Sequence, residues 1–373
     1  MRPLSPTDLA PEEPTGWGGS PTRAAVFPEA GHRADLAQCR ALLATGSRSF
    51  FTASLLLPAR IREPASALYA FCRLADDAVD LSADPAAGLA GLQGRLAAAY
   101  EGRPEDHPVD RAFAGVVRRF DIPRALPEAL FEGFAWDAEG RRYETLEDLE
   151  GYAVRVAGTV GMMMSVLMGR RAPEVLARAC DLGAAMQLTN IARDVGEDAR
   201  AGRIYLPLAW LRSEGIDPAG FLARPEPSPA LARILEGLLA AADRLYATGA
   251  AGIGRLPAGC RPAIRAAALI YAEIGREIRR NGLDSITRRA VVGGRRKALL
   301  AARAIAPIAP GTGGLHGPPI ASAAGLVERT AGPSAHADGP RSGAERIVWV
   351  VDLFDRLERA ERARRTAARR PGS

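Results

Sequence analysis

Residues 68–80 read LYAFCRLADDAVD, a run in which three aspartates and one arginine interrupt an otherwise apolar, alanine-rich stretch. In a helix over residues 66–82, one face carries a polar stripe made of Tyr69, Arg73, Asp76 and Asp80. The adjacent stripe is apolar and holds Leu68, Cys72, Ala75 and Val79. The pattern predicts a helix whose charges lie beside a buried face. Asp77 lies about 100° away from Asp76 and is expected to have a hydrogen-bonding role.

The same geometry recurs in MQLTNIARDVGEDARAGRIYLP, residues 186–207. One helical stripe holds Gln187, Asn190, Asp194 and Asp198. The neighbouring apolar stripe holds Ala184, Leu188, Ile191 and Val195. A single pair of aspartates four residues apart would suit a solvated helix, but its recurrence beside a second apolar wall favours a binding site.

Two helices that offer carboxylate and amide oxygens can bind Mg²⁺, which prefers oxygen ligands and shares its coordination shell with substrate phosphates. Arginines would add charge-assisted hydrogen bonds to a diphosphate, and Arg73, Arg193 and Arg203 lie close to the two acidic stripes in the sequence. The apolar walls suggest that the diphosphate carries a long hydrocarbon.

The composition favours a helical protein, and no nucleic-acid partner is expected. Apolar residues make up 47% and charged residues 25% of the 373 residues, and the net charge is a mild +6. We see no alternating strand pattern and no glycine-rich phosphate loop, so the predicted fold class is all-α. The four cysteines are widely spaced, which suits a reducing cytoplasm. No secretory signal or membrane-spanning run is apparent.

The chain is predicted to have four parts. Residues 1–33 read as a disordered tail, 34–306 as the helical domain, 307–343 as a Pro/Gly-rich linker and 344–373 as an amphipathic, Arg-rich C-terminal helix and tail. The apolar face within 347–357 could pack back on the domain, contact a partner or lie on a membrane.

Several motifs together resemble the squalene/phytoene synthases, the family that joins two prenyl diphosphates head-to-head. They are GSRSF (46–50), YAFCRLADDAVD (69–80), YAVRVAGTVG (152–161), QLTNIARDVGEDARAGRIYLP (187–207) and IYAEIG…ITRRA (270–290). The resemblance implies the isoprenoid-synthase fold, a single helical domain around a central cavity, with the two aspartate-rich helices facing each other.

The resemblance also implies the site residues. The metal-binding positions are Asp76, Asp80, Asn190, Asp194 and Asp198. The expected catalytic set adds Tyr69, Arg73 and Tyr205 to the four aspartates. Substrate-binding positions are Ser47, Arg48, Ser49, Phe50, Arg73, Tyr152, Val156, Ala157, Gly161, Gln187, Leu188, Asn190, Arg193, Arg203, Tyr271 and Arg289. Gly158 is expected to keep the helix backbone accessible or close to another helix, and Met162, Met163 and Met164 could line the tunnel or belong to the core.

The implied activity is condensation of two geranylgeranyl diphosphates, through the cyclopropane prephytoene diphosphate, to 15-cis-phytoene, the first committed step of carotenoid biosynthesis. It would need Mg²⁺, with Mn²⁺ as a substitute, and no NADPH. The nearest alternative is a C30 synthase that uses farnesyl diphosphate and makes dehydrosqualene, hydroxysqualene, presqualene diphosphate or squalene. A non-catalytic relative would be expected to lose the aspartates, which are present here. We expect a cytoplasmic protein with peripheral membrane contact, and other carotenoid-pathway enzymes are candidate partners.

Overall fold

A computed structural model of the protein describes residues 29–80, 85–306 and 315–333. Within these ranges the regular structure is entirely helical, as the sequence predicts. The first helices in chain order are α1 (Glu29–Gly46), α2 (Arg48–Ser54), α3 (Ala59–Asp80), α4 (Pro85–Tyr100), α5 (Pro108–Phe120), α6 (Ala125–Ala138), α7 (Leu146–Ala153), the π-helix η1 (Val154–Gly158) and α8 (Thr159–Leu167). They are followed by α9 (Pro173–Arg200), α10 (Leu208–Ser213), α11 (Pro218–Ala223), α12 (Pro229–Ile253), α13 (Arg261–Arg280), α14 (Gly294–Ile305), the 3₁₀ helix η2 (Ala321–Ala323) and α15 (Ala324–Thr330).

Local sequence signals define several helix ends. Thr145 and Asp148 form a reciprocal capping box at the start of α7. Ser228 caps α12, which then begins with Pro229, a residue whose fixed φ suits the first helical turn. Gly202, just after α9, has a φ of +79°, a conformation that glycine adopts without steric cost. The chain therefore turns sharply after the second acidic stripe.

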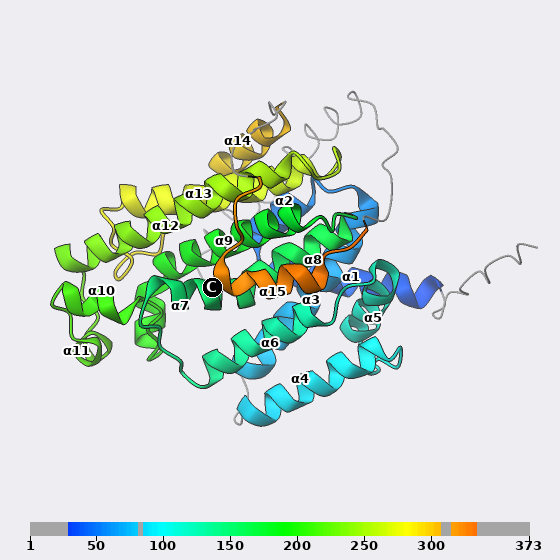
Figure 1. Cartoon of the computed structure of the whole chain (residues 1–373), viewed down its shortest axis with the longest axis horizontal. Helices are drawn as coiled ribbons and strands as arrows, with labels where there is room; N and C mark the ends of the chain where they lie inside the picture. Colours follow the sequence, from blue (N-terminus) through cyan, green and yellow to red (C-terminus); the bar gives the residue numbers. More distant parts are fainter. Residues whose placement is uncertain (1–28, 81–84, 307–314, 334–373) are drawn as a thin grey trace, which may run out of the picture.

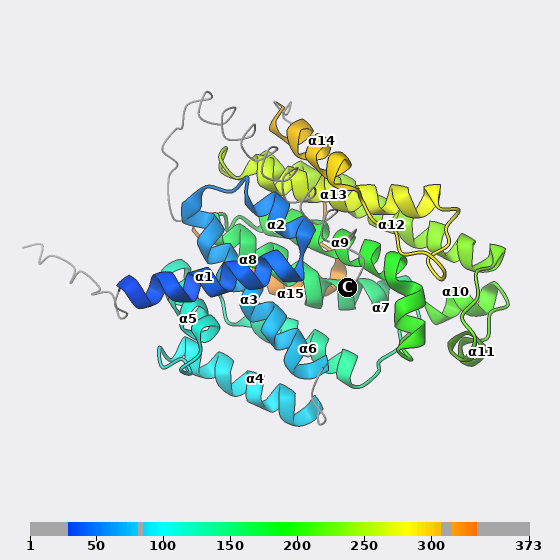
Figure 2. The ribbon, with the colours of Figure 1, turned by 180° about the vertical axis from the view of Figure 1, so that it is seen from behind.

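Helix α9 lies at the centre of the molecule and packs against α12, α13, α8 and η1. In Figures 1 and 2, α4 and α5 lie at one edge of the bundle and α14 at the opposite edge. One buried cluster joins α3, α5, α6 and α8, where the rings of Phe71 and Phe113 stack with centroids 3.7 Å apart. A second joins α9, α12 and α13. The candidate site lies between these two clusters.

The predicted boundaries differ from the structure at both ends of the domain. Helix α1 already begins at Glu29, inside the predicted tail of residues 1–33. Part of the predicted linker, residues 315–333, is folded against the domain, because Leu315, Leu326 and Val327 are buried. The remainder of the tail and linker, and the predicted C-terminal helix of 344–373, lie outside the described residues.

A buried arginine attaches the segment of residues 315–333 to the domain. Arg178 of α9 is 2% exposed and lies 2.8 Å from the carboxylate of Asp181. Its guanidinium donates hydrogen bonds of 3.0–3.3 Å to the carbonyl oxygens of Leu315, Gly317 and Pro318. Burial and hydrogen bonds from Arg178 therefore order a segment whose Pro/Gly-rich composition predicts a linker.

Among the described residues, no helix combines the length and apolar character that crossing a membrane requires.

Candidate active site

A cavity of about 430 Å³ lies in the middle of the helical domain. Its walls come from α1, α2, α3, α6, α7, η1, α8, α9 and α13. Eleven of the residues predicted to form the site line it: Phe50, Tyr69, Arg73, Asp76, Tyr152, Val156, Ala157, Gly161, Gln187, Asn190 and Tyr271.

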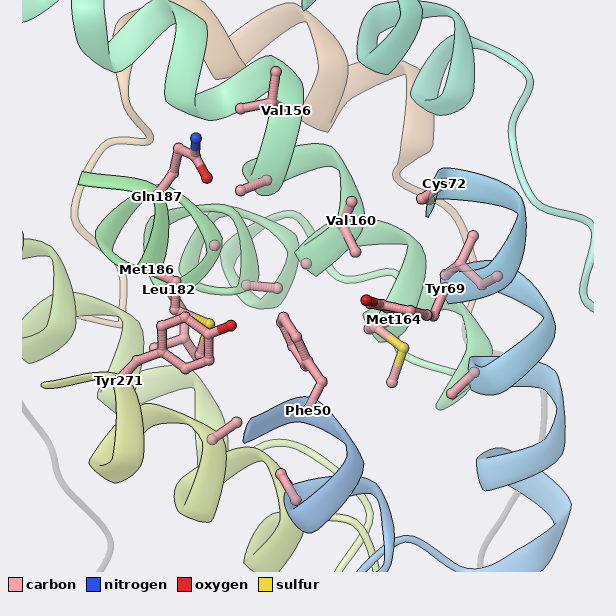
Figure 3. A pocket seen from close by; sticks show the side chains of 18 of the residues that line it. Phe50, Tyr69, Cys72, Val156, Val160, Met164, Leu182, Met186, Gln187 and Tyr271 are labelled. Carbon is pink, nitrogen blue, oxygen red and sulfur yellow. The ribbon is translucent and has the colours of Figure 1, made fainter. Parts of the chain in front are cut away.

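The wall of the cavity is mostly apolar. Figure 3 shows Tyr69 and Cys72 of α3 on one side and Met186 and Gln187 of α9 on the other, with Phe50 between them. The ring of Phe50 lies 6.3 Å from that of Tyr69 and 5.4 Å from that of Tyr271. A long hydrocarbon chain would meet methionine, alanine and aromatic carbon along this wall.

Small residues bring the π-helix wall close to α9. A Cβ atom added to Gly158 would lie 2.6 Å from the sulfur of Cys180, and one added to Gly161 would overlap the carbonyl of Ala179. Gly161 also lines the cavity, so close helix packing and access of a ligand to the backbone occur together there. π-Helical turns are often found at functional sites.

The acidic stripe of α3 reaches the cavity at Arg73 and Asp76. The Arg73 guanidinium donates to Asp76 over 3.2 Å and lies 2.6 Å from the carboxylate of Asp77. Asp76 lines the cavity, whereas Asp77 does not, as expected from their separation around the helix. This leaves one carboxylate of the pair directed at the ligand space.

The acidic stripe of α9 continues beyond the cavity, where Asp194 is surrounded by cations. Arg193 donates two hydrogen bonds of 2.8 and 2.5 Å to its carboxylate, and Arg289 donates a third of 2.8 Å. Although burial favours the neutral acid, these bonds lower the pKa of Asp194 below its usual value. The sequence-predicted residues Arg193, Asp194 and Arg289 are thus brought together.

One helical turn further along α9, Asp198 experiences the opposite electrostatic environment. Burial, followed by the negative charge of Asp194, raises the pKa of its carboxyl to about 7. Arg203 partly offsets this shift, and its backbone N–H donates to the carbonyl of Asp198 over 2.8 Å. The turn at Gly202 thus brings Arg203 close enough to Asp198 for its positive charge to favour the ionised carboxylate.

Asp137, near the end of α6, is a cavity residue that the sequence analysis missed. Its carboxylate accepts hydrogen bonds from the hydroxyls of Tyr152, at 2.8 Å, and Tyr205, at 2.7 Å. The rings of Tyr152 and Tyr205 stack with centroids 5.2 Å apart. The available signal was an acid within the aromatic run LFEGFAWDA (130–138).

Several predicted residues lie outside the cavity lining. Ser47 caps α2, and Ser49 is half-buried on the same helix. Leu188 is fully buried in the core around α9. Of the three methionines only Met164 lines the cavity, while Met162 and Met163 belong to the core. The side chains of Arg48 and Asp80 lie outside the part of the chain that the structure describes.

Comparison with known proteins identifies the family. Residues 43–296, more than half of the chain, match the family model described as squalene/phytoene synthase. The chain belongs to the squalene/phytoene synthase family. The phytoene synthase of Rhodobacter capsulatus is 53% identical over 82% of this chain and 92% of its own length. That of Cereibacter sphaeroides is 50% identical over 87% of this chain and 95% of its own length.

Solved structures of the family share the fold. A dehydrosqualene synthase superposes with a TM-score of 0.68 at 34% identity, over 74% of this chain and 98% of its own. The squalene synthase HpnC from Alicyclobacillus acidocaldarius superposes with a TM-score of 0.63 at 26% identity, over 69% of this chain and 97% of its own. The predicted isoprenoid-synthase fold is therefore confirmed.

The family consists of prenyltransferases that depend on a divalent metal ion. Among the described side chains, no group of three or more His, Cys, Asp or Glu is gathered closely enough to bind a metal ion. The donor set nevertheless suits a hard cation. The Oδ1 of Asn190 is buried without a hydrogen-bond partner in the described structure, and Asp194 and Asp198 repel each other along the same helix. An orphaned amide oxygen beside two carboxylates is the kind of site that a divalent metal ion stabilises.

Proposed function

We propose that the protein condenses two molecules of geranylgeranyl diphosphate head-to-head to 15-cis-phytoene, with release of both diphosphates and without a reductant. The observation that carries the proposal is one apolar cavity lined by polar side chains of both acidic helices, Arg73 and Asp76 from α3 and Gln187 and Asn190 from α9. The phytoene synthases at 53% and 50% identity support the same activity. Such a reaction is the first committed step of carotenoid biosynthesis.

We assign Mg²⁺ as the metal, with Mn²⁺ as a substitute, held by Asp76, Asp80, Asn190, Asp194 and Asp198. A bound divalent cation supplies positive charge that stabilises the departing diphosphate. The protein's own cations add to this charge. Arg193 and Arg289 meet at Asp194, and Arg203 lies near Asp198, so arginine donors surround the place where a diphosphate would bind.

The cavity wall suits carbocation chemistry. Each of the two ionisations breaks one C–O bond to diphosphate. Carbon–carbon bond formation follows the first and rearrangement of the cyclopropane follows the second, and each is completed by loss of one proton from carbon. Two diphosphates and two protons therefore leave the two substrates, which balances the hydrocarbon product. The π-faces of Phe50, Tyr69 and Tyr271 can stabilise a cation electrostatically without bonding to it. Burial raises the pKa of Tyr69 to about 12, so its hydroxyl stays neutral at neutral pH.

Exclusion of water is the second requirement, because water would capture each cation as an alcohol. Apolar side chains such as Leu68, Val160 and Met164 line the space between the acidic ends of α3 and α9. The hydroxyl of Tyr152, which lines this space, is held by the carboxylate of Asp137. The protein's contribution to the reaction is thus to bind the diphosphates, orient the chains and keep the cavity dry.

A C30 reaction with farnesyl diphosphate is the second candidate. The observation that favours it is the likeness to the dehydrosqualene synthase structure, at 34% identity. The higher identity to phytoene synthases favours the C20 substrate.

The test is to incubate the purified full chain with geranylgeranyl or farnesyl diphosphate, Mg²⁺ and no NADPH, and to identify the hydrocarbon by mass. We expect phytoene from the C20 substrate. A C30 hydrocarbon alone, or a product that forms only with NADPH, would contradict the proposal.

We also propose a reducing, cytoplasmic location. All four cysteines, Cys39, Cys72, Cys180 and Cys260, are free thiols, which is typical of proteins from reducing compartments.

A further inference from the structure

Helix α14 lies at the outer edge of the molecule, where it packs on α13 and α2 (Figures 1 and 2). Leu300, Ala301 and Ala304 form its buried inner side. Arg295, Leu299 and Arg303 are exposed and follow each other at intervals of four residues, so they share the outward side of the helix. Helix α14 therefore presents one covered side to the domain and one side to solvent.

The segment that contains α14 is strongly basic. Residues 285–306 include five arginines and one lysine and no acidic residue. Two of these cations form ion pairs within the domain. Arg289 binds Asp194, and Arg296 binds the buried carboxylate of Glu273. Arg295 and Arg303 lie instead on the outward side of the helix, and Arg288 is exposed on the connection before it. This edge of the molecule should attract a polyanionic surface.

Apolar side chains are exposed within the same basic segment. The large apolar residues that the described structure leaves exposed are Leu42, Val291 and Leu299, and two of these three lie here. Val291 is 67% exposed just before α14, and Leu299 is 58% exposed between Arg295 and Arg303. Exposed leucine and valine among arginines are typical of helices that lie in a lipid interface, where the apolar groups enter the acyl boundary and the cations meet phosphate.

We propose that Val291, Arg295, Leu299 and Arg303, here called the α14 face, dock the protein on an anionic lipid bilayer. Charge would also attract nucleic acid, but the two exposed apolar side chains favour lipid. Helix α13, on which α14 packs, supplies Ala263, Ile264, Ala267 and Tyr271 to the cavity wall. Docking would thus bring one wall of the cavity close to the bilayer.

Docking by the α14 face is independent of the proposed reaction. It also differs from a role for residues 347–357, which lie outside the described residues.

The test measures co-sedimentation of the full chain, without substrate, with phosphatidylcholine vesicles that contain or lack phosphatidylglycerol. We expect the unmodified chain to bind the anionic vesicles. Reversal of two charges, Arg295→Glu with Arg303→Glu, should lower the partition coefficient by more than about tenfold. Val291→Ser with Leu299→Ser should lower it by at least about fivefold, although the net charge is unchanged.

The matched control is Arg118→Glu with Arg142→Glu, which changes the net charge equally at exposed positions outside α14. It should retain most of the binding, and circular dichroism verifies that every variant is folded. Binding by the Arg295→Glu/Arg303→Glu variant equal to that of the control would overturn the proposal. So would absence of binding by the unmodified chain. Competition of a duplex oligonucleotide for the α14 face, with no effect of Val291→Ser/Leu299→Ser, would assign the face to nucleic acid instead.

Discussion

Asp137 accepts a hydrogen bond of 2.7 Å from the Tyr205 hydroxyl, although the two residues are 68 positions apart in the chain. The same carboxylate accepts the Tyr152 hydroxyl. One acid therefore joins α6, α7 and the segment after α9 at the cavity wall. Since both tyrosine hydroxyls are already donated to Asp137, their positions are fixed before substrate enters.

We predict that Asp137→Ala lowers turnover by about 10- to 100-fold, the effect expected when hydrogen bonds to a charged group are worth about 1.5–3 kcal/mol. Tyr205→Phe should also lower turnover, and the double variant should lose less than the product of the two effects because both act through one contact. Glu132→Gln, on the same helix but partnered with Arg155, is the control. Unchanged turnover in Asp137→Ala would show that the contact does not position the tyrosines for the reaction.

Gly161→Ala is predicted to destabilise the fold by about 1–3 kcal/mol, because the new methyl group overlaps the Ala179 carbonyl of α9. Turnover should fall as well, since Gly161 lines the cavity. The control is Gly94→Ala, a helical glycine of α4 with open space around its Cα. That change should stabilise the protein by about 0.5–1 kcal/mol. Urea unfolding compares the two variants, and equal stabilities would rule out backbone contact at Gly161.

Arg178→Met should cost about 3–5 kcal/mol of unfolding free energy, because it leaves the buried Asp181 without its cation. It also removes the donors that hold the carbonyls of Leu315, Gly317 and Pro318. Limited proteolysis should therefore cut the segment of residues 315–333 faster than in the unmodified chain. Arg329→Met, at an exposed position of α15, is the control and should behave like the unmodified chain. A proteolysis rate equal to the control's would contradict the assigned attachment.

We predict that the buried carboxylate of Glu273 makes the free energy of unfolding depend on pH in the acidic range. Its carboxylate is fully buried among Arg276, Arg280 and Arg296, and although burial acts in the opposite direction, their hydrogen bonds lower its pKa from 4.5 to about 2. The folded state therefore binds this proton less readily than the unfolded state. Its contribution, up to about 3 kcal/mol, is complete above the unfolded pKa and is lost as the pH falls from about 4.5 to 2.

Denaturant unfolding of Glu273→Gln and the unmodified chain at several pH values tests this dependence. The difference in unfolding free energy should be largest near neutral pH and should shrink in the acidic window. Glu277→Gln, in the last turns of the same helix, should show a much smaller difference. A difference that is constant across the window would contradict the assigned ionisation.

The acidic helices could be predicted from sequence because helical periodicity is a local property, and Arg73, Asp76, Gln187 and Asn190 do line one cavity. The recurrence of the polar stripe in two helices, together with the family motifs, predicted the isoprenoid-synthase fold. Asp137 could not be predicted, since its role depends on tyrosines from two other elements. The segment 315–333 was mistaken for a linker because the order comes from Arg178, far away in sequence. Leu188, Met162 and Met163 point into the core rather than the cavity, a direction that apolar character alone does not reveal.

The central claim is that α3 and α9 form two halves of one diphosphate site. The most direct test measures the turnover of geranylgeranyl diphosphate across a range of Mg²⁺ concentrations. It compares three variants with the unmodified chain: Asp76→Asn, Asp194→Asn and Asp77→Asn. The account predicts a loss of at least about 100-fold for Asp76→Asn and for Asp194→Asn, since each removes a carboxylate proposed to hold the divalent cation whose positive charge stabilises the departing diphosphate. Asp77→Asn, adjacent to Asp76 in sequence but paired with Arg73 and not assigned to the metal, should lose less than about tenfold. Turnover at the unmodified rate in either Asp76→Asn or Asp194→Asn would contradict the two-helix site.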